Sequence, residues 1–178
     1  MAEPNKVRIN QTKNKITSWL EDVGVKYEVS KLEEKELSDL LEFFILANIR
    51  DRKYSIYTMK KFPDRVIIQG EISLIEEHRK ITRDMDNAKY NTFIINLQDK
   101  LTSYDVRYEF VTEGKQVNII KIHQFIHYDV LDKDRFLQTY VRVQEVSNII
   151  INLVSFGLGV ATPSPTSTAS ADTPSFIT

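Results

Sequence analysis

The chain has 178 residues, of which 42% are hydrophobic and 28% charged, a balance typical of one globular domain that builds its own core. Its formal net charge of -1 excludes a general electrostatic attraction to nucleic acid or to acidic membranes. The chain contains no cysteine, which excludes disulfide frameworks, thiol nucleophiles and Cys-ligated zinc.

The first predicted element is an amphipathic helix over residues 10–23, because apolar side chains recur there at the spacing of one helical face. These side chains are Ile16, Trp19, Leu20 and Val23. Residues 25–29 alternate apolar and polar side chains, which fits a short strand. Residues 30–42 are acidic and fit either a solvated loop or a weak helix.

Three strands of a predicted antiparallel meander follow. Residues 43–49 and 54–59 are rich in β-forming side chains, and a third run contains residues 66–68 and is closed by Gly70. The short polar segments between these runs have the composition of turns. We therefore expect three neighbouring strands in sequence order.

The middle of the chain predicts helical structure and then two further strands. A helical period extends over residues 75–85, residues 84–87 offer a new N-cap, and the main helix covers about residues 87–103. Strands are predicted at residues 106–111 and 117–126. The second of these carries apolar side chains on both faces, which is typical of a central strand.

A last helix is predicted from Asp132 or Asp134, either of which can cap it, to Phe156, with its end at Gly157. After it the composition changes, since residues 161–178 contain nine Ser or Thr and three Pro. Such a segment buries too little apolar surface to offset its ordering entropy.

We therefore predict a single α+β domain over residues 1–158 and a disordered Ser/Thr/Pro-rich tail over residues 159–178. The most apolar late stretch, residues 149–160, is interrupted by polar residues and glycine and falls short of the about 20 apolar residues that span a membrane. The polar N-terminus does not resemble a signal peptide. These features lead us to expect a cytoplasmic protein that does not enter a membrane.

The order of elements, α-β-β-β-α-β-β-α, resembles the fold of type III secretion chaperones and their relatives. Several segments are also similar to an archaeal family of uncharacterised proteins with this fold. They are residues 65–68, 75–78, 93–97 followed by 106–110, and 131–136 at the head of a helix that contains 141–143. The resemblance covers about residues 9–156. It implies a five-stranded, mainly antiparallel sheet with helices packed on it, and it implies no reaction and no functional residue.

The sequence predicts no catalytic, metal or cofactor site. On a strand, His123 and His127 would point the same way but lie about 13 Å apart at roughly 3.3 Å per residue, too far to share one ion. Asp84 and Asp86 begin like a calcium loop, but the glycine and the final glutamate of such a loop are missing. No glycine cluster can hold a phosphate, and no nucleophile lies in a catalytic motif. We expect a protein that is not an enzyme and holds no cofactor.

A nucleic-acid interface is the alternative that the sequence leaves open. Residues 50–65 contain six Lys or Arg against two Asp, interleaved with Tyr54, Tyr57 and Phe62, a composition suited to base stacking with a basic rim. The two basic groups, however, lie in turns at opposite ends of one strand, about 25 Å apart at roughly 3.3 Å per residue. This geometry weighs against nucleic acid.

The last helix is the most informative feature, because it is apolar over a wider arc than a helix covering a sheet requires, about 100°. One stripe consists of Phe136, Tyr140, Val143, Ile150 and Val154, and a second of Leu137, Val141, Val146, Ile149, Leu153 and Phe156. Ile151 falls outside the first stripe. Surplus apolar surface marks either a partner surface or a deeply buried helix.

From these observations we predict a protein-interaction or chaperone-like module that binds another polypeptide. One possible partner is a second copy of the same chain, which would give a homodimer. The candidate contact residues are Phe136, Tyr140, Val143, Ile151 and Phe156. The alternative function is a nucleic-acid-associated protein that uses residues 50–65.

Overall fold

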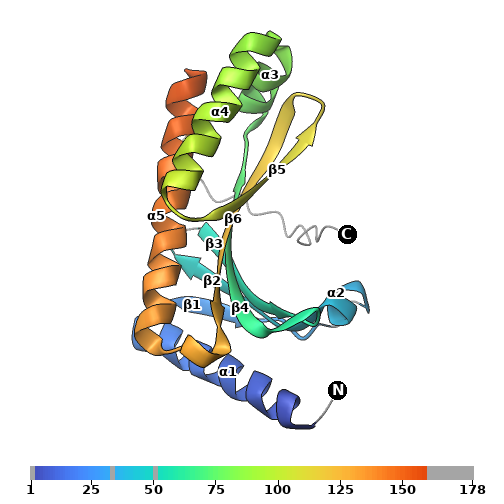
Figure 1. The fold of residues 1–178 in the computed structure, drawn as a ribbon, viewed down its shortest axis with the longest axis vertical. Coiled ribbons are helices and arrows are strands. Elements are labelled where there is room, and N and C mark those ends of the chain that lie inside the picture. Colours follow the sequence, from blue (N-terminus) through green and yellow to red (C-terminus); the bar gives the residue numbers. More distant parts are fainter. Residues whose placement is uncertain (1–2, 33–34, 50–51, 160–178) are drawn as a thin grey trace.

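The computed structural model describes residues 3–32, 35–49 and 52–159, and it consists of a curved antiparallel sheet with long helices on one face (Figure 1). The elements of these ranges are, in chain order, α1 (Glu3–Asp22), β1 (Lys26–Val29), α2 (Lys35–Leu40), β2 (Leu41–Ile49), β3 (Arg52–Met59), β4 (Phe62–Ser73), α3 (Glu76–Asp84), α4 (Asn87–Ser103), β5 (Arg107–Glu113), β6 (Gln116–His127), the short 3-10 helix η1 (Tyr128–Val130) and α5 (Lys133–Leu158). The predicted α+β class is confirmed.

Within the described ranges the sheet has six strands in the order β1-β2-β3-β4-β6-β5, and all neighbouring pairs are antiparallel. The predicted count of five is therefore wrong by one strand. The additional strand is β1, which pairs along β2 from Lys26 opposite Asn48 to Val29 opposite Ile45. The acidic segment that follows contains the weak helix α2, and β2 already begins at Leu41.

The sheet carries two apolar cores on its helix-covered face, and α5 joins them. At about 1.5 Å per residue the 26 residues of α5 span roughly 39 Å, enough to cross both halves of the sheet. Phe136 and Tyr140 belong to the first core, with residues from α1, β2 and β3. Ile150 and Val154 belong to the second core, with residues from α4, β5 and β6.

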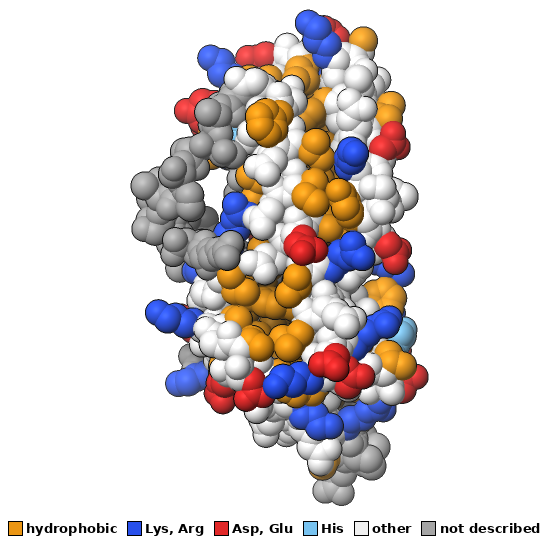
Figure 2. Space-filling model, turned by 90° about the vertical axis from the view of Figure 1, so that its left-hand side faces the viewer, with side chains coloured by type: hydrophobic (Ala, Val, Ile, Leu, Met, Phe, Trp, Pro, Cys, Tyr) orange, Lys and Arg blue, Asp and Glu red, His pale blue; other side chains and the backbone are white. Residues whose placement is uncertain are grey.

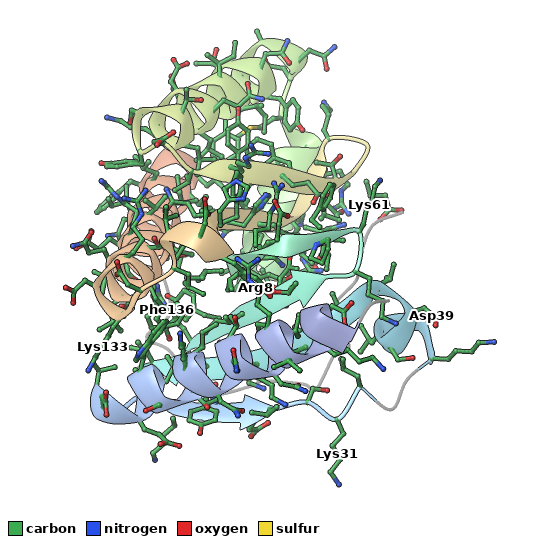
Figure 3. The ribbon with its side chains drawn as sticks, turned by 60° about the horizontal axis from the view of Figure 1, so that its bottom comes forward. Arg8, Lys31, Asp39, Lys61, Lys133 and Phe136 are labelled. Atoms are coloured by element: carbon green, nitrogen blue, oxygen red, sulfur yellow. The ribbon has the colours of Figure 1, made fainter. Side chains whose placement is uncertain are left out.

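The end of α1 is attached to the beginning of α5 (Figure 3). The Nζ atom of Lys133 lies 2.7 Å from Oδ2 of Asp22, and the ring of Trp19 lies 5.6 Å from that of Phe136. Val23, which the sequence places on the apolar stripe of this helix, is 47% exposed beyond its last turn. The stripe therefore ends at Leu20.

Several predicted ends of elements are corrected by long-range packing. β4 does not stop at Gly70 but continues to Ser73, because the residues beyond Gly70 still pair with β6. α5 does not stop at Gly157 but continues to Leu158, and Gly159, with φ +67°, forms its left-handed C-cap. Of the predicted tail, residues 160–178 lie outside the described residues.

A β-bulge explains why the apolar side chains of β6 do not simply alternate. Along β5 the pairing passes from Val111 opposite Ile119 to Thr112 opposite Val117, so one residue of β6 is left over. The extra residue shifts Val117 onto the face of Ile120, and both are buried in the second core. β6 lies between β4 and β5 and is thus the central strand that its sequence predicts.

Candidate functional site

Three of the five predicted contact residues are part of the core. Phe136, Tyr140 and Val143 are at most 2% exposed. The Phe136 ring stacks on that of Tyr140 at 6.1 Å, and the Tyr140 ring meets Tyr54 edge-on at 5.6 Å. Burial raises the pKa of Tyr54 and, more strongly, that of Tyr140. These three residues offer no surface to a partner, which corrects their assignment.

The other two predicted contact residues lie on different sides of α5. Ile151 is half-buried and lines a small hollow with Ile75 and His78. Phe156 is 85% exposed and lies five residues further along the helix, about 140° around its axis. The structure therefore does not bring Ile151 and Phe156 together, and only Phe156 has the exposure expected of a contact residue.

Phe156 borders an apolar groove between α4 and α5, which we call the α4–α5 groove. Its cavity volume is about 400 Å³, and its lining residues are Phe93, Asn96, Leu97, Asp99, Lys100, Leu153, Phe156 and Gly157. On the helical side of the molecule, apolar side chains form a vertical band between polar ones (Figure 2).

The groove arises from the way two amphipathic helices share one core. On α4, Phe93, Leu97 and Lys100 follow one another at helical spacing, and the two apolar residues among them are buried. On α5, Leu153 is partly buried and packs against the second core, while Phe156 projects beyond it. On α5 the exposed large apolar side chains are Val141 (44%) in its N-terminal half and Phe156 (85%) near its C-terminal end, and Phe156 is the more exposed of the two.

The signal that could have located this groove is present in the sequence. Leu153 and Phe156 belong to the second apolar stripe of the last helix, and Phe93 and Leu97 to the stripe of the main helix. Periodicity shows that each stripe exists. It does not show which stripe the sheet covers, because that depends on the crossing of the two helices in three dimensions.

The basic region at residues 50–65 does not offer the aromatic surface that stacking on bases requires. Tyr54 and Tyr57 are buried, at 2% and 6% exposure, and Phe62 is 40% exposed. The Phe62 ring already lies under two cations, with Nζ of Lys61 at 5.7 Å and Cζ of Arg65 at 5.1 Å from its centroid. Two residues of this region, Arg50 and Asp51, lie outside the described residues.

Ionisable side chains form surface pairs instead of a reactive cluster. Asp64 accepts two hydrogen bonds from the Arg65 guanidinium, at 2.9 and 3.0 Å, and its Oδ2 lies 3.1 Å from Nδ1 of His127. The bonds from Arg65 lower the pKa of Asp64. Across residues 3–32, 35–49 and 52–159, no three His, Asp or Glu side chains are grouped so that they could hold a metal ion.

None of the described helices is both long enough and apolar enough to cross a bilayer.

Comparison with known proteins places the chain beside other uncharacterised proteins. A family model described as "Uncharacterized conserved protein (DUF2299)" matches residues 12–154. A crystal structure of an uncharacterised protein from Methanothermobacter thermautotrophicus superposes with a TM-score of 0.73 at 19% identity, and the match covers 83% of this chain and 99% of that one. This likeness shows a shared fold. The expected relation to an uncharacterised family is confirmed, and the structural relative is archaeal.

A second structure, that of YbjN from E. coli, matches with a TM-score of 0.46 at 11% identity, covering 84% of this chain and 95% of that one. A likeness at this score supports no conclusion about this chain. No curated protein matches the chain.

Proposed function

We propose that this chain, which belongs to the DUF2299 family of uncharacterised conserved proteins, is a protein-interaction module that acts by binding and not by catalysis, and that its α4–α5 groove contacts a second copy of the same chain. The observation that supports this proposal is the exposure of Phe156, 85%, at the edge of an apolar groove of about 400 Å³.

An exposed phenylalanine beside an apolar groove is a favourable nucleus for association. Fully burying such a side chain contributes about 1.5–3 kcal/mol, and aromatic side chains dominate the energetics of contact surfaces. In a dimer with two-fold symmetry each subunit would insert its Phe156 into the groove of the other, so that this gain is made twice.

The charges at the groove favour a second copy over an acidic or a basic partner. Asp99 and Lys100 are adjacent residues at the groove on α4, so one acid and one base are presented together. A two-fold arrangement in which Asp99 of one copy faces Lys100 of the other would pair both groups with an opposite charge. A partner of uniform charge would leave one of the two without a counter-charge.

The resemblance of the chain to type III secretion chaperones supports the same class of function. It rests on the order of elements and on short segments, and so it is an analogy of fold. A chaperone-like role is therefore part of this proposal.

Sedimentation velocity over a range of protein concentrations tests the proposal. We expect the wild-type chain to dimerise and the variant Phe156→Asp to be monomeric at the same concentrations. Ile95→Asp is the matched control, because Ile95 is 53% exposed on the same pair of helices and does not line the groove. A monomeric wild type, or equal loss of association in both variants, contradicts the proposal.

A further inference from the structure

The face of the sheet that turns away from α1, α4 and α5 carries a second hollow, which we call the sheet hollow. In the described residues, α2 packs at one end of this face, against Leu41, Phe44, Tyr57 and Ile67. The cavity has a volume of about 280 Å³, and its lining residues are Leu40, Tyr57, Met59, Phe62, Arg65, Ile67, Gln69, Glu71, Arg107, Glu109, Lys121, His123 and Phe125. Most of its polar residues lie at one end and most of its apolar residues at the other, where Arg65 is the one cation.

The polar end is a row of three side chains across neighbouring strands. In the sheet register Gln69 on β4 lies opposite His123 on β6, and His123 lies opposite Arg107 on β5. The Arg107 guanidinium is held over the Phe125 ring, with Cζ 4.7 Å from the centroid. A cation in a fixed position therefore borders the hollow.

Among the described residues, Arg107 has no acidic partner and the half-buried His123 ring has no hydrogen-bond partner. Both can donate to an oxygen anion placed between them.

The remaining polar groups of the hollow are already engaged. The Tyr57 hydroxyl donates to Oε1 of Gln69 at 2.9 Å, and Nε2 of Gln69 donates to Oε1 of Glu71 at 2.8 Å. The two acidic residues, Glu71 and Glu109, both lie opposite Lys121 in the register, which gives each carboxylate a cation beside it. The groups left to bind a ligand are thus cationic or hydrogen-bond donors.

The apolar end accepts a hydrocarbon chain. Ile67 and Phe125 face each other across β4 and β6. The Phe125 ring is already occupied by two cations, with Cζ of Arg65 at 4.9 Å and Cζ of Arg107 at 4.7 Å from its centroid, so the apolar contact begins at Ile67. Beyond Ile67, the side chains of Met59, Leu40 and Phe62 complete the hollow, the last two each 40% exposed. An apolar ligand on these residues would remove exposed hydrocarbon from water on both sides of the contact.

We propose that the sheet hollow binds a small amphiphilic carboxylate. Its carboxylate lies between Arg107 and His123, and its apolar chain runs along Ile67 toward Met59. The volume of about 280 Å³ corresponds to the lower end of small-molecule sites, about 300 Å³, and is too small to enclose a folded partner. This site is separate from the α4–α5 groove and does not depend on dimer formation.

Isothermal titration calorimetry with decanoate, below its micelle-forming concentration, tests this proposal. Decanol is the matched uncharged ligand, and decyltrimethylammonium the ligand of opposite charge. We expect saturable binding of decanoate and at least tenfold weaker binding of the other two, since a hydrogen bond to a charged group contributes about 1.5–3 kcal/mol.

The variant Arg107→Met keeps the apolar stem of the side chain and removes its charge. It should weaken decanoate binding at least tenfold, which corresponds to about 1.4 kcal/mol. Lys53→Met is the matched control, because Lys53 is an exposed cation on β3 of the same sheet that does not line the hollow. It should bind decanoate as the wild type does.

Three results would overturn the proposal. The first is no saturable binding of decanoate, and the second is an equal loss of affinity in Arg107→Met and Lys53→Met. The third comes from 1H–15N NMR spectra recorded during the titration, if the shifted amides lie in α4 and α5 instead of β4, β5 and β6. A chain that binds an acidic peptide but shows no saturable binding of decanoate would also overturn the proposal.

Discussion

The replacement Gly70→Ala tests how closely α5 is packed on the sheet. A Cβ atom at Gly70 would lie 2.7 Å from Oγ of Ser147 on α5 and 3.2 Å from Cε1 of Tyr54 on the neighbouring strand. The first distance is shorter than Cβ atoms tolerate, so the helix or the Ser147 side chain must move. Overpacking of this kind costs about 1–3 kcal/mol.

The expected sign is opposite to that of an unhindered Gly→Ala change. Where the backbone accepts alanine, such a change stabilises by about 0.4–1 kcal/mol through the unfolded state. Subtracting this gain from the overpacking cost leaves a net destabilisation of about 0–2.6 kcal/mol for Gly70→Ala, with a midpoint of about 1.3 kcal/mol. Urea unfolding followed by the fluorescence of Trp19, the one tryptophan of the chain, measures this difference.

A double-mutant cycle assigns the cost to its cause. Ser147→Ala removes the Oγ atom, which in the wild type donates a hydrogen bond of 2.7 Å to the Val143 carbonyl oxygen. In the Gly70→Ala background it should recover part of the lost stability, with a coupling energy of about 1 kcal/mol. Gly157→Ala is the matched control. A Cβ there meets Phe93 at an ordinary 3.7 Å, so it should stabilise α5 by up to about 1 kcal/mol. A stabilising Gly70→Ala refutes this packing.

Three further predictions concern the core, a helix cap and one histidine. Phe136→Ala should lower the free energy of unfolding by about 3–5 kcal/mol, measured by urea unfolding; a cost below about 1 kcal/mol means that Phe136 lies on the surface. Asp132→Ala removes the side chain that caps α5 at the Arg135 amide, 2.7 Å away, and should cost about 1 kcal/mol in thermal unfolding; no change contradicts the cap. Burial, and to a lesser extent the charges of Arg107 and Lys121, lower the folded-state pKa of His123 below 6.5. The unfolded chain then binds more protons, so the free energy of unfolding falls as the pH drops from about 6.5 toward that lowered pKa. The variant His123→Gln should lose less stability than the wild type over this range. If urea unfolding shows the same loss of stability with pH in both proteins, His123 does not have this lowered pKa.

Local patterns in the sequence are sufficient to predict the helices and most strands. The main helix was predicted at residues 87–103 and is observed at Asn87–Ser103, with Asp86 as its N-cap. Its side chain accepts a hydrogen bond from the Lys89 amide at 2.8 Å. Such caps are encoded within four residues, so no tertiary information is needed to find them.

The features that sequence reasoning missed depend on contacts between distant residues. Gly70 was interpreted as the end of a strand, whereas the close approach of Ser147 explains why a glycine stands inside β4. The alternation in β6 is interrupted by a bulge whose position is defined by β5. The sequence pattern of either strand alone contains neither of these facts.

The candidate surfaces were predicted only in part for the same reason. Of the predicted contact residues, Phe156 is 85% exposed, while Phe136, Tyr140 and Val143 belong to the stripe that faces the sheet. The sheet hollow combines residues of four strands and α2, and only the register of the strands brings Arg107 beside His123.

Spin labelling of single-cysteine variants measures whether the α4–α5 groove is the contact between two copies. The chain has no cysteine of its own, so Asn152→Cys introduces one label on exposed α5 surface, one helical turn before Phe156. If two copies meet at the α4–α5 groove, the label-to-label distance between them at this position should be short. The distance should be much longer for the control Asp129→Cys, which lies before the opposite end of α5. No coupling between copies at residue 152, or a shorter distance at residue 129, would contradict this contact.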